Sequence, residues 1–318
     1  MGASGFVGAN LLKLLLQVRS DVYGTAFATP AWRLQDVPDV NVFTLDLLVP
    51  QSARAVMREV QPGTVFDCVA YGAYSFENDP ERIYNTNVSS KARLVELLCE
   101  MGTHCYIHAG SSSEYGERAD QPSEESALHP NSHYAVAKAA AAHLVYFAGQ
   151  HRSLRCANLR LYSVYGPLEE PSRLMPTLIA NALSGTYPSL VAPHVSRDYL
   201  YVDDACEAFV DAALRLPPNL HGHSFNIGTG VSTTIEELAL LARDLFRIDD
   251  VPAFSTMPNR NWDFQGRWRA RTDKAESQLA WKSRTSLRDG LLLFADWYRV
   301  CANPTLYRRQ AKGSSTPR

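Results

Sequence analysis

The alternation of helix-like and strand-like segments constrains the fold of this 318-residue chain more than any other feature. From residue 6 to residue 161, segments with apolar residues on a helical period alternate with short segments rich in β-branched and aromatic residues. The strand-like segments TVFDCVAY and HCYIHAG are apolar at most positions, which is typical of strands covered on both faces. We therefore predict an α/β fold in which a doubly wound parallel sheet occupies the first half of the chain.

The second half of the chain has a different rhythm. After residues 165–167 (YGP), helical segments are separated by Gly- and Pro-rich stretches and by the short segments RDYLYVDD and SFNIGTG. No internal repeat and no low-complexity linker separates the halves. This pattern predicts a smaller C-terminal lobe that packs on the first half.

Composition excludes several classes of function. The formal net charge is −2, which gives no electrostatic reason to expect nucleic acid as a partner. No apolar run reaches the roughly 18 residues that a membrane span needs, so we expect a cytoplasmic protein without a membrane partner. The six cysteines contain no C-x-x-C pair and the nine histidines show no ligand spacing, so we predict no metal site.

The first ten residues, MGASGFVGAN, contain three glycines in the spacing G-x-x-G-x-x-G, followed by a helical pattern. Gly2, Gly5 and Gly8 would permit a tight turn and bring the backbone close to a pyrophosphate. The helix that starts at Phe6 and Val7 would present N–H groups to the phosphates. By itself this spacing fits an ordinary turn equally well, and it becomes a dinucleotide site only in a wider context.

The strand that normally precedes such a loop is missing from the written sequence. In a doubly wound sheet the first strand lies in the middle, so its loss would leave two half-sheets with unpaired edges. We expect the written start to lie downstream of the true one, with Met1 at the last position of a strand. The alternative is a fold that closes the gap in another way.

A second group of residues has the spacing of an acid/base site. Tyr134 and Lys138 lie at i and i+4 of a helical segment, which places them on one face. About 20 residues upstream, a predicted strand ends in a serine cluster that includes Ser111. The carboxyl edge of a parallel sheet is where ligands bind. Tyr134 would exchange a proton with a substrate hydroxyl, Lys138 would lower the pKa of that phenol, and Ser111 would orient the substrate oxygen.

With these motifs in order, the chain resembles an extended short-chain dehydrogenase/reductase of the nucleotide-sugar epimerase/dehydratase group. The segment LDL resembles the cofactor-binding segment of that group. The segment NTNVSSKARLVELL resembles its helix with the fourth catalytic residue, and LRLYSVYGP resembles its strand beside the nicotinamide. RDYLYVDD and FNIGTG resemble its sugar-nucleotide lobe. The resemblance implies functional roles for the following residues: Asn87 in catalysis; Asp46, Leu47, Tyr134, Lys138 and Tyr162 in cofactor binding; Ser112, Ser113, Arg197 and Asn226 in substrate binding.

The resemblance also implies the domain organisation and the partners. A Rossmann-like NAD(P)-binding domain would span residues 1–166 and receive about 198–228, and residues 167–197 and 229–318 would form the nucleotide-sugar lobe. The implied partners are a nucleoside-diphosphate sugar and a second copy of the chain, paired as a homodimer through a four-helix bundle.

The reaction itself stays open at this stage. Ser112 and Ser113 occupy the positions where 4,6-dehydratases of the group carry an acid and a base. Because a serine hydroxyl is a poor base, these residues disfavour a dehydratase. A one-residue bulge that brought Glu114 to the base position would remove this objection. The segment GSSSEYG is similar to that of GDP-4-keto-6-deoxymannose reductases, and this resemblance favours a 4-keto-6-deoxyhexose reductase, with a 4-epimerase as the alternative. A 4,6-dehydratase and a non-catalytic dinucleotide-binding regulator are less favoured.

The choice between NAD and NADP rests on the end of the second strand of such a sheet. That position holds Ala26 and Phe27 instead of an acidic residue, and the nearest cation is Arg33. Because no carboxylate would repel a 2′-phosphate, the sequence mildly favours NADP over NAD.

Overall fold

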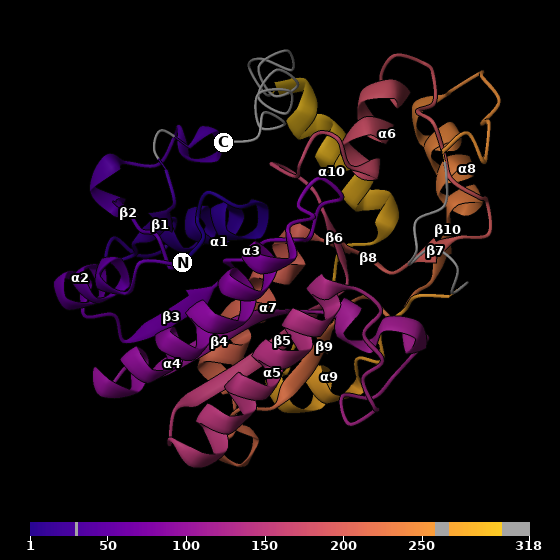
Figure 1. Cartoon of the computed structure of the whole chain (residues 1–318). Helices are drawn as coiled ribbons and strands as arrows, with labels where there is room; N and C mark the ends of the chain where they lie inside the picture. Colours follow the sequence, from indigo (N-terminus) through magenta and orange to yellow (C-terminus); the bar gives the residue numbers. More distant parts are fainter. Residues whose placement is uncertain (29–30, 258–266, 301–318) are drawn as a thin grey trace.

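The computed structural model describes residues 1–28, 31–257 and 267–300. Its central sheet has four parallel strands in the order β3-β4-β5-β9 (Figure 1). These strands are β3 (Thr64–Asp67), β4 (Cys105–Ser111), β5 (Arg155–Leu161) and β9 (Ser224–Ile227). β4 and β5 are buried at nearly every position, as their continuous apolar sequences predicted. The predicted parallel sheet is therefore confirmed.

Helices cover both faces of this sheet. One face packs against α7 (Val202–Arg215), α9 (Asp273–Leu279) and Leu11 of α1 (Phe6–Leu16). The other face packs against α2 (Pro50–Val60), α4 (Ser90–Glu100) and α5 (His133–His151). Each layer brings apolar side chains onto the pleated sheet, so the sheet is wound on both sides as expected. Within the described residues, no helix is long and apolar enough to cross a membrane.

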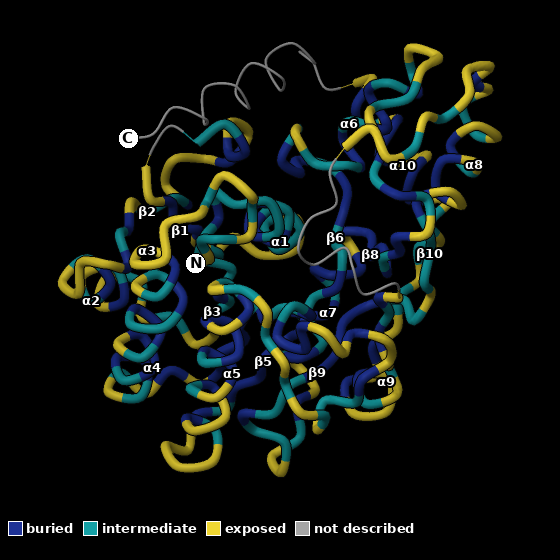
Figure 2. Tube along the Cα trace, turned by 45° about the vertical axis from the view of Figure 1, so that its right-hand side comes forward, coloured by how far each residue is buried: buried dark blue, intermediate teal, exposed yellow. Residues whose placement is uncertain are grey.

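A second parallel pair stands apart from the central sheet. β1 (Gly24–Ala26) pairs with β2 (Val42–Thr44), and neither pairs with β3. Between them lies the start of the chain: the amide of Cys68 donates to the Met1 carbonyl oxygen at 3.1 Å, and Ala3 N–H donates to the Thr25 carbonyl oxygen at 2.8 Å. Figures 1 and 2 both show the N-terminus in this position. The structure therefore has the two half-sheets expected from the sequence.

The C-terminal lobe has its own core. Buried side chains of α6 (Leu174–Ala182), α8 (Ile235–Phe246) and α10 (Leu287–Val300) pack together with Tyr199 and Tyr201 of β8 (Tyr199–Tyr201). α8 begins at a capping box in which Thr234 and Glu237 satisfy each other's backbone N–H groups. Two short strand pairs, β6 (Ser163–Tyr165) with β8 and β7 (Ser196–Arg197) with β10 (Thr233–Thr234), lie where the chain passes between the lobes (Figure 1). The dark core of this lobe is seen in Figure 2.

Candidate active site

The glycine loop leads directly into α1 and fits a pyrophosphate. Gly2 has a φ of +76°, and a Cβ atom there would lie 2.8 Å from the amide nitrogen of Val69. A Cβ atom on Gly8 would fall on the carbonyl group of Gly2. Gly5 is the N-cap of α1, and no side chain among the described residues caps the helix. The first N–H groups of α1 therefore have no side-chain partner within this part of the chain, which is the geometry that binds phosphate groups.

Ser111 and Tyr134 come together from two elements. Ser111 is the last residue of β4, and Tyr134 lies in the first turn of α5, which starts where the Ser132 side chain accepts from the Ala135 amide at 3.1 Å. Burial raises the pKa of Tyr134 above its usual range, and the nearby Ser111 hydroxyl offsets part of this effect. The predicted pair of hydroxyl groups is thus present at the carboxyl edge of the sheet.

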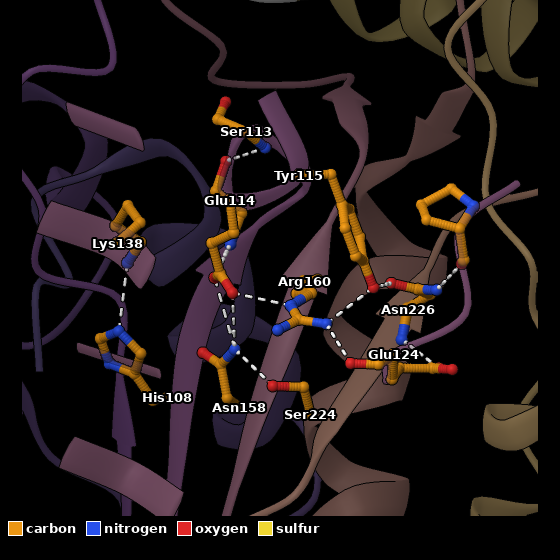
Figure 3. Close-up of polar contacts among 12 residues, drawn as sticks. His108, Ser113, Glu114, Tyr115, Glu124, Lys138, Asn158, Arg160, Ser224 and Asn226 are labelled. Atoms are coloured by element: carbon orange, nitrogen blue, oxygen red, sulfur yellow. Dashed lines mark hydrogen bonds and ion pairs between the residues drawn. The ribbon is translucent and has the colours of Figure 1, made fainter. Parts of the chain in front are cut away.

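Lys138 is fully buried one turn after Tyr134, and its ammonium group points to β4. It donates to the carbonyl oxygen of Ala109, and it lies 3.1 Å from Nε2 of His108 (Figure 3). Burial, followed by the nearby charge of Lys91, lowers the pKa of Lys138 to about 8. In this structure burial raises the pKa of the Tyr134 phenol, and the lowering expected from Lys138 stays a prediction.

A buried polar network lies behind Lys138, and the sequence reasoning missed it. The carboxylate of Asp67 accepts from Lys91 Nζ at 2.9 Å and from the Tyr106 hydroxyl at 2.8 Å, and it lies 3.1 Å from Nδ1 of His108. Burial alone would raise the pKa of Asp67, but Lys91 and His108 outweigh it and hold this pKa well below its usual range. The missed signal was an Asp and a His in two apolar strands, which become direct neighbours in the parallel register of β3 and β4.

His108 is neutral in this network. Burial, with the nearby ammonium of Lys138, lowers the pKa of His108 to about 3. A neutral imidazole carries one proton, and Nδ1 faces the carboxylate of Asp67, so the geometry assigns the proton to Nδ1 and leaves Nε2 as an acceptor for Lys138. The ring thus connects the ammonium group of Lys138 to a buried carboxylate.

Asn87 lies in a π-helical turn, residues 85–89, between α3 (Pro80–Tyr84) and α4. Its amide donates to the carbonyl oxygens of Tyr71 at 2.6 Å and Ile83 at 2.9 Å, and it accepts from the Tyr71 amide at 3.3 Å. The adjacent Gly72 lies against the Tyr134 ring, since a Cβ atom there would be 3.2 Å from Tyr134 Cδ2. Asn87 therefore holds the loop that packs on Tyr134. None of these hydrogen bonds of Asn87 goes to Tyr134 or Lys138.

Glu114 is fully buried and engaged by neighbouring polar groups. Its carboxylate forms an ion pair with Arg160 at 2.7 Å and accepts from the Ser111 amide at 2.9 Å, and Asn158 lies at its other side (Figure 3). The neighbouring Ser112 is buried, and its hydroxyl accepts from Trp268 Nε1 at 3.0 Å. These polar contacts hold the side chains of Glu114 and Ser112 in place.

The remaining predicted substrate residues lie in different environments. Asn226 is fully buried: it accepts from the Tyr115 hydroxyl at 2.7 Å and donates to the Pro122 and Arg271 carbonyl oxygens, so its side chain positions other segments (Figure 3). The guanidinium carbon of Arg197 lies 5.3 Å from the centroid of the Trp268 ring, and the indole of Trp268 donates to Ser112. Ser113 is partly exposed and donates its amide to the Ser111 hydroxyl oxygen.

The predicted cofactor-binding residues outside the glycine loop lie near β2 and in a cluster of aromatic side chains. Asp46 and Leu47 follow β2, where the Asp46 carboxylate accepts from the Leu48 amide at 2.8 Å and Leu47 is buried. Tyr162 packs with Tyr115 and Trp268, and its buried hydroxyl has no hydrogen-bond partner within residues 1–28, 31–257 and 267–300.

Arg33 does not reach toward a phosphate. Its side chain is buried, and it donates to the carbonyl oxygens of Leu168 at 2.8 Å and Ser4 at 3.2 Å. It also stacks 4.1 Å from the Trp32 ring centroid and lies 3.7 Å from Glu170. This guanidinium therefore ties the glycine loop to the segment after Gly166.

The doubly wound sheet and the glycine loop are those of a dinucleotide-dependent enzyme. The family described as "NAD dependent epimerase/dehydratase family" matches residues 1–228, and the chain belongs to this family of nucleotide-sugar enzymes. Similar solved structures include the UDP-glucose 4-epimerase of Thermotoga maritima with UDP-glucose (TM-score 0.83, 25% identity, 94% of this chain and 97% of that one). The UDP-glucose 4-epimerase of Thermus thermophilus with NAD gives TM-score 0.83 and 25% identity over 95% of this chain and 98% of that one.

Relatives found by sequence also match most of the chain. A UDP-glucose 4-epimerase of Mycolicibacterium smegmatis is 27% identical over 309 residues, which cover 94% of this chain and 97% of that protein. A dTDP-glucose 4,6-dehydratase of Streptomyces antibioticus is 24% identical over 311 residues, covering 94% of this chain and 91% of that protein. The family relation is therefore shown over most of the chain, and it includes more than one reaction.

Proposed function

We propose that the protein is an NAD-dependent 4-epimerase of a nucleoside-diphosphate sugar, with a UDP-hexose as the substrate class. This reading replaces the 4-keto-6-deoxyhexose reductase that the sequence favoured. It is supported by similarity to UDP-glucose 4-epimerases over nearly the whole chain. The observation that carries it is the placement of Ser111 at the end of β4 near Tyr134 in the first turn of α5, one helical turn before the buried Lys138.

The surroundings of Glu114 argue against a 4,6-dehydratase. Such an enzyme needs a base for the C5 proton in addition to the group that acts at C4. Glu114 is held by Arg160 at 2.7 Å, and the hydroxyl of Ser112 is held by Trp268. The bulge that would have freed Glu114 is absent, because Glu114 completes a capping box with Ser111. The chemistry supported by these residues is confined to a single hydroxyl group.

In this proposal the chain's own residues move one proton. NAD supplies the hydride acceptor and donor when it is bound. Tyr134 takes the proton from the C4 hydroxyl and returns it after the sugar has turned, and Ser111 orients the same oxygen. The buried ammonium of Lys138 adds positive charge near the phenol when the proton leaves. Because a 4-epimerase needs no further acid or base, these three side chains suffice.

The fit to NAD rests on the glycine loop and on Arg33. The uncapped start of α1 and the close approach at Gly2 and Gly8 would hold the pyrophosphate. Arg33, the cation nearest to the end of β1 in the sequence, is committed to carbonyl groups and to Glu170, which favours NAD over the NADP that the sequence mildly favoured. The solved Thermus relative was determined with NAD.

The homodimer remains part of the proposal. α5 exposes Val136, Tyr146 and Phe147, each at least 40% exposed, and Val136 and Phe147 lie three turns apart on one side of the helix. Pairing of α4 and α5 with those of a second copy would cover these side chains. A molar mass of two chains by light scattering would support this arrangement.

The test is incubation of the purified protein and NAD with UDP-glucose or UDP-galactose, with the products separated and followed by NMR. Interconversion of the two C4 epimers supports the proposal. Consumption of NADH with a nucleoside-diphosphate 4-keto-6-deoxyhexose and no epimerisation would instead establish the reductase. Tyr134→Phe should abolish epimerisation, and Tyr146→Phe, an exposed phenol on the same helix, is the matched control.

A further inference from the structure

Two buried lysines lie around a single carboxylate behind the active site. Lys91 comes from the first turn of α4 and Lys138 from α5, and both side chains are fully buried. Asp67 of β3 forms a direct ion pair with Lys91 at 2.8 Å, and the ring of His108 connects it to Lys138. The two ammonium groups thus stand in different relations to the same negative charge.

The carboxylate of Asp67 is fully occupied by its direct partners. Its Oδ1 accepts from Lys91 Nζ at 2.9 Å and from the Val69 amide at 3.1 Å. Its Oδ2 lies 2.8 Å from Lys91 Nζ, accepts from the Tyr106 hydroxyl at 2.8 Å and lies 3.1 Å from Nδ1 of His108. A carboxylate has about four lone-pair positions, so these contacts leave no position for a second ammonium group.

Lys138 is therefore held by uncharged groups. Its Nζ lies 3.1 Å from Nε2 of His108 and donates to the carbonyl oxygen of Ala109. Burial keeps the imidazole neutral by lowering the pKa of His108 to about 3. Neither contact takes away the positive charge of Lys138, which lies one helical turn after Tyr134.

The other titratable groups around Lys138 do not offset this charge either. The carboxylate of Glu114 forms an ion pair with Arg160 at 2.7 Å. Burial raises the pKa of the Cys68 thiol to about 11, so this group is neutral at working pH. Within the described residues, the buried cluster of Lys91, Asp67 and Lys138 thus carries one excess positive charge.

We propose that Lys91 is a positioning residue of the active site, which occupies the carboxylate of Asp67 and so keeps the ammonium group of Lys138 without a carboxylate partner. Without Lys91, Asp67 would be an unpaired buried carboxylate, and the charge of Lys138 would balance it. The ammonium would then favour the phenolate of Tyr134 less when the proton moves. This inference rests on the acid/base role of Tyr134 in the proposed function.

The kinetic test compares Lys91→Met, Asp67→Asn and the double variant of the full chain. Lys91→Met removes the excess positive charge, so kcat for the epimerisation of UDP-glucose should fall about 10-fold while KM changes less than about 2-fold. The double variant removes the ion pair as a unit and leaves Lys138 charged, so kcat should return to within about 3-fold of the wild type. A merely structural role predicts that the two losses add. A double variant as slow as Lys91→Met would overturn the proposal.

A second measurement follows the charge of Lys138 without turnover. In protein with ¹³C-labelled lysine ε-carbons, the NMR signal that is absent from Lys138→Met identifies this residue. The pKa of Lys138, about 8, should rise by about one pH unit or more in Lys91→Met, because a neighbouring positive charge is lost. It should fall in Asp67→Asn and return toward about 8 in the double variant. Equal pKa values in the wild type, Asp67→Asn and the double variant would overturn the proposal even if Lys91→Met did not fold.

The two measurements separate this proposal from the reaction. The titration needs no substrate, so the expected shifts in a protein without epimerase activity would support the role of Lys91 and count against the proposed reaction. Epimerisation in all variants at the wild-type rate would keep the reaction and overturn the role of Lys91. Lys13→Met, which removes a lysine at the surface, should change neither kcat nor the titration of Lys138.

Discussion

Nζ of Lys138 lies 3.1 Å from Nε2 of His108, so the buried ammonium one helical turn after Tyr134 contacts an imidazole as well as the Ala109 carbonyl oxygen. The same ring reaches Asp67 through Nδ1 at 3.1 Å. The carboxylate thus balances the charge of Lys138 from a distance, while Lys91 forms the direct ion pair with it at 2.8 Å. The position and protonation of Lys138 depend on residues of two neighbouring strands.

His108→Phe should change the pH dependence of the reaction. The neutral imidazole accepts from the ammonium form of Lys138, so its loss should lower the pKa of Lys138 further below about 8, by about one unit. The ammonium form is present below this pKa and is lost as the pH rises through it. The alkaline limb of kcat/KM should therefore move to lower pH, which a pH–rate profile measures. His104→Phe, an exposed position just before the same strand, should leave the profile unchanged.

Lys91→Met should destabilise the fold by about 3–5 kcal/mol, because it leaves the buried carboxylate of Asp67 without its ion-pair partner. Urea unfolding at pH 7 measures the loss. The surface pair of Lys13 with Asp36 offers the control, since Lys13→Met should cost less than about 1 kcal/mol. Similar losses in the two variants would contradict the assigned role of Lys91.

The effect of Lys91 should also depend on pH. The folded-state pKa of Asp67 lies below its unfolded value of about 3.9. Such a group contributes stability that is fully present above the unfolded pKa and is lost as the pH falls through the folded pKa. The difference in unfolding free energy between the wild type and Lys91→Met should therefore be constant from pH 5 to pH 7 and shrink below about pH 4. Urea titrations across this range provide the measurement.

Gly8→Ala should impair both folding and cofactor binding. The added Cβ atom would fall on the backbone carbonyl of Gly2, so the loop must move away from α1. We expect the Kd for NAD to rise about 10-fold or more, as measured by calorimetry. Gly63→Ala is the matched control, since a Cβ atom there meets no atom of the described residues within 4 Å. An unchanged Kd in Gly8→Ala would remove the pyrophosphate site from this loop.

NAD should bind at least about 10-fold more tightly than NADP, since Arg33 is engaged with Leu168, Ser4 and Glu170 and cannot pair with a 2′-phosphate. The two dissociation constants are compared under the same salt conditions. Arg33→Met should lower the stability of the glycine loop without changing this ratio. Tighter binding of NADP would restore the cofactor preference drawn from the sequence.

Much of the fold and part of the site were predicted from local sequence patterns. The apolar strands and the periodic helices indicated the parallel sheet because each pattern lies within a short stretch of consecutive residues. The i, i+4 spacing of Tyr134 and Lys138 placed them on one face for the same reason. The π-helical turn at Asn87 could not be read in this way, since the segment from residue 80 to residue 101 has one continuous helical pattern.

The sequence by itself determined the α/β architecture, the glycine loop and the order in which Ser111, Tyr134 and Lys138 appear, because each depends on short-range spacing. Only the tertiary structure decided what these groups contact. Glu114 meets Arg160 across 46 residues, and Asp67 meets His108 across 41, because strand register and burial bring them together. In a site without water, each buried charge must find a partner, and that partner is chosen by the packing of distant segments.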